Sequence, residues 1–150
     1  CPSVGTIVAW LKENTKVGKN TVFYTGSATS RNAQAFAATI EGAQTFTSAF
    51  MTGDLKSKGF ETWLDECGGS ACEQDLLIPR MSEALAKASA DTSYVMVKEG
   101  EKIDTSKIWS TAEYPALQSN KVEVWAVNSA TKDFTTNLQK KRYDGTTTFP

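Results

Sequence analysis

Apolar residues in the first 90 positions recur mainly at helical spacing. Residues 4–13 carry one apolar stripe of this kind, and residues 30–40 repeat it at i, i+3, i+4 and i+7. Asp54 is a residue type that caps helix N-termini. These patterns predict five helices, at residues 4–13, 30–40, 45–51, 54–64 (capped by Asp54) and 73–90.

Three segments show strand character instead, with β-branched and aromatic residues or alternating apolar and polar positions: residues 21–24, 93–98 and 121–127. The final segment combines a helix predicted at 131–140 with a Thr-rich tail. We expect a single domain of residues 1–150, helical to about residue 90 and strand-rich from about residue 91. The expected fold class is α/β (α+β mixed), with N-terminal helices packed on a small, mainly parallel sheet.

Two loops follow the predicted strands and carry polar and aromatic side chains. Tyr24-Thr25-Gly26 follows the first strand, and residues 98–113 follow the second. In parallel sheets, ligands bind beyond the carboxyl ends of the strands. We therefore expect both loops to open onto one rim of the sheet.

The charge balance limits the partners. The 150-residue chain has 16 basic and 17 acidic residues, a net charge of −1, and no basic block. Nucleic-acid binding is disfavoured, because proteins that bind a phosphate backbone concentrate positive charge on one surface. Binding of a small phosphorylated ligand is not excluded. No apolar stretch approaches the roughly 20 residues that cross a bilayer, so we expect no membrane span.

The chain contains no histidine. Catalysis by Ser-His-Asp or Cys-His groups and His-based ribonuclease chemistry are therefore excluded. The remaining chemistry must use carboxylates, hydroxyls, aromatic rings or lysines. No metal site is expected, because there is also no second cysteine pair.

Three cysteines occur, Cys1, Cys67 and Cys72. The short, glycine-containing interval between Cys67 and Cys72 would let these two close a small disulfide. The chain begins at Cys1 without an initiator methionine, as a removed signal peptide or a trimmed expression product would leave it. We expect a secreted, extracellular protein, and the alternative is a cytosolic protein with reduced thiols.

The most informative pattern lies in the second half of the chain. A strand-like run at 91–100 ends in Val-Met-Val-Lys-Glu-Gly, residues 108–117 hold Glu113 among aromatic and hydroxyl side chains, and Val-Glu-Val-Trp-Ala-Val follows at 122–127. This order resembles the C-terminal half of the ADP-ribosyl cyclase / NAD glycohydrolase family. The resemblance implies that Glu113 is the catalytic residue, that NAD is the substrate and that no separate cofactor is needed.

The resemblance extends over about residues 20–127. The family has an aromatic–hydroxyl pair after its first strand, and Tyr24-Thr25 stands in that place. Ser82 matches a family serine, whereas Ile78 replaces the family's tryptophan one helical turn earlier.

Two further family features differ here. Gln-Thr-Phe-Thr at 44–47 replaces a segment whose glutamate influences whether the product is cyclised or hydrolysed. Most family disulfides are missing, and the resemblance leaves one, between Cys67 and Cys72.

The role implied for Glu113 follows from the reaction. Loss of nicotinamide leaves an oxocarbenium-like ribosyl centre that a nearby carboxylate stabilises. The nicotinamide group of NAD is already a cationic leaving group, so no general acid is required to protonate it. Without the resemblance, Glu113 would be interpreted as a solvated loop residue.

Other candidates would hold the substrate. Trp109 and Tyr24 could stack on nicotinamide or adenine, and core packing is their alternative role. Ser82 could bind a phosphate, although a lone helix serine is usually just exposed. Thr25, Gly26 and Ser27 could offer backbone and hydroxyl donors to a pyrophosphate at the start of a helix.

The sequence thus predicts a secreted NAD glycohydrolase that yields ADP-ribose, cyclic ADP-ribose or both. NAD is the expected small-molecule partner, and a homodimer stays open. One alternative is a non-catalytic secreted binding or effector protein with a nucleotide pocket. Another is a carboxylate-based glycoside hydrolase, in which a second acid pairs with Glu113: Glu99, Glu101 or Asp104.

Overall fold

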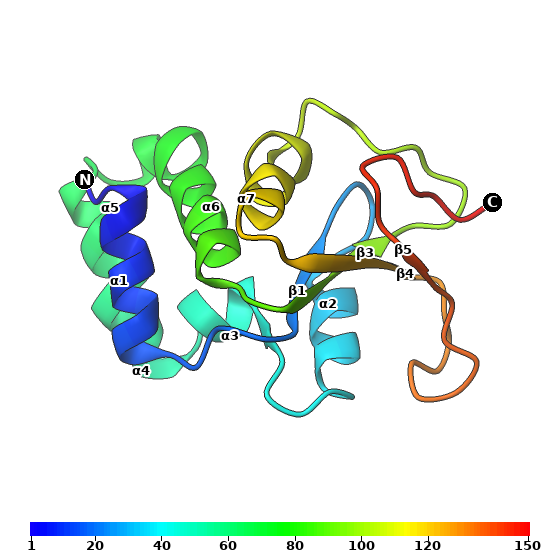
Figure 1. Cartoon of the computed structure of the whole chain (residues 1–150). Coiled ribbons are helices and arrows are strands. Elements are labelled where there is room, and N and C mark those ends of the chain that lie inside the picture. Colours follow the sequence, from blue (N-terminus) through cyan, green and yellow to red (C-terminus); the bar gives the residue numbers. More distant parts are fainter.

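A five-stranded sheet with helices on both faces forms the centre of the protein (Figure 1). The computed structural model describes all 150 residues. The strand order is β2-β1-β3-β4-β5. The first four strands are parallel and β5 is antiparallel to β4, so the predicted α/β class is confirmed. The strands are β1 (Thr21–Tyr24), β2 (Gln44–Thr45), β3 (Thr92–Val97), β4 (Glu123–Asn128) and β5 (Lys140–Arg142).

The helices up to residue 88 follow the predicted ranges with small shifts of their ends. The helix at Tyr114–Ser119 and the helical segment before it lie where the sequence predicts a loop. Short π-helical segments at Ser57–Glu61, Glu73–Leu77 and Trp109–Glu113 lead into α5, α6 and α7. No helix combines the length and apolar character that a bilayer crossing needs. The helices are α1 (Val4–Asn14), α2 (Ser30–Ala37), α3 (Phe46–Phe50), α4 (Gly53–Lys56), α5 (Thr62–Glu66), α6 (Ile78–Ala88) and α7 (Tyr114–Ser119).

The predicted cap at Asp54 is wrong. The N-cap of α4 is Thr52, and Asp54 already lies in the first turn. Gly53 adopts a positive φ of 53°, and the helix begins two residues earlier than the polar pattern suggested. Asp54 still suits this position, because a negative charge in the first turn is favoured by the helix dipole.

Side chains alternate between the two faces of the sheet. Val22 of β1 joins Met96 and Val127 in a smaller cluster under α2, which adds Phe36. Phe23, the next residue, faces the larger cluster that contains residues of α1, α6 and α7. The central strands β1, β3 and β4 are therefore fixed in register by two apolar surfaces.

The helix predicted at 131–140 is wrong. Residues 129–139 form turns and irregular structure, and β5 begins at residue 140. The Asp133 carboxylate accepts hydrogen bonds from the backbone N–H of Thr135 and from the Thr136 hydroxyl. Such side-chain hydrogen bonds compete with a helix. Phe134 and Leu138 instead pack on the α2 side of the sheet.

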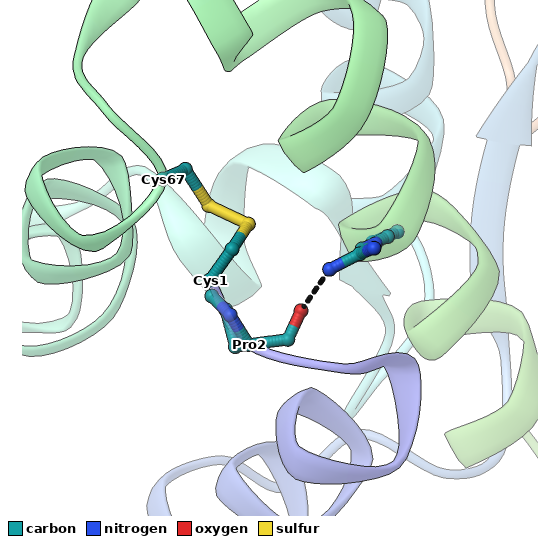
Figure 2. Close-up of a disulfide and its surroundings, with 4 residues drawn as sticks. Cys1, Pro2 and Cys67 are labelled. Carbon is teal, nitrogen blue, oxygen red and sulfur yellow. Dashed lines mark hydrogen bonds between the residues drawn. A yellow bond between two sulfur atoms is a disulfide. The ribbon is translucent and has the colours of Figure 1, made fainter.

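The predicted disulfide between Cys67 and Cys72 is also wrong. The structure joins Cys1 to Cys67 and leaves Cys72 as a free thiol (Figure 2). Arg80 of α6 donates a hydrogen bond to the Pro2 carbonyl at 2.8 Å, and the disulfide joins Cys1 to the residue that follows α5, so the N-terminus is attached to both helices. Tertiary contacts therefore supply a partner that local spacing could not reveal.

Candidate functional site

A pocket of about 600 Å³ lies at the carboxyl ends of β1 and β3. β1 has β2 on one side and β3 on the other, and β4 follows β3 away from β1. The connection from β1 leads to β2 on one side, and the connection from β3 leads to β4 on the other. The two connections therefore diverge at the border between β1 and β3, which is where open parallel sheets bind ligands. The loops after β1 and β3 line this pocket together, so the expectation of one shared rim is confirmed.

Glu113 forms part of the pocket wall from the last position of the π-helical segment before α7. It is 8% exposed, and no ion pair or hydrogen bond joins its carboxyl group, which opens onto the pocket, to another residue. Burial raises the pKa of Glu113 from its ordinary 4.5 to about 8. The Glu113 carboxyl group is therefore mainly protonated at neutral pH, and a bound cation would favour its ionised form.

Tyr24 ends β1 and lines the same pocket. At 38% exposure it is the one large hydrophobic side chain of the protein that is exposed. Burial of part of the ring, and then the nearby Glu113 carboxyl group, raise the pKa of the Tyr24 phenol. An accessible aromatic ring and a buried acid therefore face one cavity.

Trp109 forms part of the pocket wall, but its ring is too buried to stack on a ligand. It lies in the π-helical segment, not in a loop, and is only 2% exposed. Its ring centre is 5.6 Å from that of Phe23, and its indole N–H donates to the Tyr143 hydroxyl at 2.9 Å. The core-packing role considered for Trp109 therefore applies, although Trp109 also borders the pocket.

Ser82 of α6 also borders the pocket. It is 5% exposed, so it is not the exposed helix serine considered as its alternative. Its hydroxyl makes no hydrogen bond to another residue and opens onto the pocket, unlike the fully buried, unpaired hydroxyls of Ser93 and Thr131. A polar ligand atom in the pocket would satisfy both Ser82 and Glu113.

Thr25 and Gly26 reach the pocket in different ways. The Thr25 side chain is buried, and its backbone N–H donates to the Met96 carbonyl at 3.1 Å. That N–H is therefore not available to a phosphate. Gly26 has a φ of 63°, which turns the chain so that the Ser27 N–H points toward the loop after β3.

The loop after β3 adds four charged residues that line the pocket. Glu101 accepts a hydrogen bond from the Ser27 N–H at 2.8 Å, and Asp104 accepts from Ser106. Lys102 and Lys107 make no ion pair. Sequence analysis placed this loop on the rim but did not single out the lysines, because isolated lysines carry no motif.

Glu99, named with Glu101 and Asp104 as a second acid for Glu113, lies elsewhere. It borders a separate polar pocket with Asn128 and the loop after β4. No group of three or more Cys, Asp or Glu side chains is close enough to hold a metal ion.

Comparison with protein-family models, curated proteins and solved structures finds no match for this chain. The resemblance to the ADP-ribosyl cyclase / NAD glycohydrolase family therefore stays a prediction. The functional inference is based on the residues that line the pocket.

Proposed function

We propose that this pocket binds NAD and that the protein cleaves its bond to nicotinamide, releasing ADP-ribose, cyclic ADP-ribose or both. One observation carries the proposal: the buried, unpaired Glu113 carboxyl group and the exposed Tyr24 ring face one cavity at the β1–β3 border.

Tyr24 and Glu113 favour a flat cation in complementary ways. The nicotinamide ring of NAD is positively charged and would lie on the electron-rich Tyr24 ring. Its charge lowers the pKa of the neighbouring Glu113, which then binds the ligand as a carboxylate.

The bond between the ribosyl C1 carbon and the nicotinamide nitrogen then breaks, and its electron pair leaves with nicotinamide as a neutral molecule. The Glu113 carboxylate stabilises the positive charge left on the ribosyl centre. Water adds to that centre and loses a proton to give ADP-ribose, or an adenine nitrogen adds to give the cyclic product. The Ser82 hydroxyl, which makes no hydrogen bond to another residue, would bind a ribose hydroxyl.

The Cys1–Cys67 disulfide supports an oxidising compartment, so the NAD that this protein meets would be extracellular.

Release of nicotinamide from NAD by the wild type and by Glu113→Gln tests the proposal. We expect the substitution to lower kcat by about 100-fold or more, because it removes the charge that stabilises the transition state. Glu99→Gln is the matched control, since it removes a carboxylate that lies outside the pocket, and it should retain wild-type activity. Equal, negligible rates for the wild type and Glu113→Gln would instead favour a non-catalytic nucleotide-binding protein.

A glycoside hydrolase is the second candidate, and a specific observation favours it. Glu113 and Glu101 line one pocket, and their pKa values are shifted in opposite directions. Such pairs supply the acid and the base of glycosidases. Hydrolysis of oligosaccharides without consumption of NAD would select this function.

A further inference from the structure

Glu101 holds the loop after β3 against the loop after β1. Its Oε1 atom accepts the hydrogen bond from the Ser27 N–H, across 74 residues of sequence. Hydrogen bonding from the Ser27 side chain and backbone, helped by the charge of Lys98, lowers the pKa of Glu101. At neutral pH the negatively charged Glu101 carboxylate therefore occupies the hydrogen-bonding position of the Ser27 N–H at the edge of the pocket.

Gly26 makes this contact sterically feasible. A Cβ atom at Gly26 would lie 1.8 Å from Oε1 of Glu101, so any side chain there would expel the carboxylate. The absence of a side chain at position 26 leaves a space that an anionic group fills.

The residues on either side of Glu101 hold the loop in place independently of the Ser27 contact. Gly100 donates its N–H to the Phe149 carbonyl of the C-terminal segment, which runs beside this loop (Figure 1). Ile103 packs on the core, whereas Lys102 and Lys107 are exposed and unpaired. Opening of the Glu101–Ser27 contact would therefore cost little packing.

We propose, on the basis of the proposed NAD-cleaving function, that Glu101 occupies the diphosphate subsite of the pocket and that a nucleotide diphosphate displaces it from Ser27. The N–H of Ser27 then donates to a phosphate oxygen, and Lys102 and Lys107 supply the positive charge. Glu101 thus acts as an internal competitor that weakens binding of anionic ligands.

Two further observations indicate that this cavity receives a polar ligand. Ser82 and Glu113 lie deeper in the same pocket, and both are more than nine-tenths buried without a protein partner. A nucleotide that reached them with its ribose would bring its diphosphate toward the rim, where Ser27 and the two lysines lie.

Binding of ADP, measured by isothermal titration calorimetry at neutral pH, tests the subsite. Glu101→Ala and Glu101→Gln should bind ADP about tenfold more tightly than the wild type, because the competing charge-assisted hydrogen bond is lost. Asp104→Asn is the matched control. It removes one negative charge from the same pocket without touching Ser27, and should change ADP affinity by no more than about twofold. Adenosine, which lacks phosphate, should bind all four proteins equally.

The inference is overturned if the Glu101 variants tighten ADP binding no more than Asp104→Asn does. It is also overturned if none of the proteins binds ADP, or if adenosine shows the same gain. Tighter ADP binding by the Glu101 variants without any release of nicotinamide from NAD would support the subsite and reject the proposed catalysis.

Discussion

The indole N–H of Trp109 donates a hydrogen bond to the Tyr143 hydroxyl at 2.9 Å. This contact joins the pocket wall to the C-terminal segment, and Tyr114 packs against both rings. The segment that carries Glu113 is therefore supported by Tyr143, which lies 34 residues further along the chain than Trp109.

Tyr143→Phe should lower the free energy of unfolding by about 1–3 kcal/mol, because it leaves a buried indole N–H without an acceptor. Tyr114→Phe is the control, since the Tyr114 hydroxyl has no hydrogen-bond partner, and it should change stability by less than about 0.5 kcal/mol. Urea denaturation monitored by fluorescence measures both. Equal losses for the two variants would show that ring packing, not the hydrogen bond, is important.

Glu113→Gln should make the protein more stable at alkaline pH than the wild type. The unfolded chain ionises Glu113 above its ordinary pKa of 4.5, while the folded protein keeps the proton until about pH 8. Wild-type stability therefore falls as pH rises through this window, by up to roughly 4 kcal/mol, and the uncharged amide of the variant does not contribute such a loss. Denaturation at several pH values should show that the difference in the free energy of unfolding between the two proteins increases toward pH 8. A difference that is independent of pH would contradict the raised pKa.

The rate of NAD cleavage should depend on the same ionisation. Because the carboxylate is the active form, kcat/KM should rise with pH and level off above the pKa of about 8 in the free protein. The bound nicotinamide cation lowers this pKa, so kcat should reach its plateau at a lower pH. Steady-state kinetics over the pH range measure both profiles. A kcat/KM that declines through this range would indicate that Glu113 acts as an acid, as the glycoside hydrolase candidate requires.

Tyr24→Ala should raise the KM for NAD by about tenfold, since it removes the accessible ring on which the nicotinamide cation would lie. Tyr24→Phe keeps the ring and should remain near the wild type. The two variants together separate stacking from any role of the phenol hydroxyl. An effect of Tyr24→Phe as large as that of Tyr24→Ala would assign the role to the hydroxyl.

Cys1→Ser should destabilise the protein by about 4 kcal/mol, because the disulfide closes a loop with a sequence separation of 66 residues. Cys72→Ser removes a free thiol and should have little effect. Peptide mapping under non-reducing conditions, with denaturation of each variant, checks the pairing. A peptide that joins Cys67 to Cys72 in the wild type would contradict the structure.

Local sequence patterns were sufficient for most of the helices, for three of the strands and for the position of the rim. Periodic apolar residues record which face of a helix is buried, and this information is contained within a few neighbouring residues. The parallel arrangement of β1 and β3 then places Tyr24 and the loop leading to Glu113 at one edge, as the order of elements predicts.

Contacts between distant segments could not be derived in this way. The partner of Cys67, the irregular course of residues 129–139, the burial of Trp109 and the Glu101–Ser27 contact all depend on how separate elements pack. Periodicity and spacing describe neighbours along the chain, whereas these features arise from residues 34 to 74 positions apart, or from side-chain hydrogen bonds that outcompete a helix. The free energy that selects them comes from burial and hydrogen bonding in three dimensions, which a one-dimensional pattern does not contain.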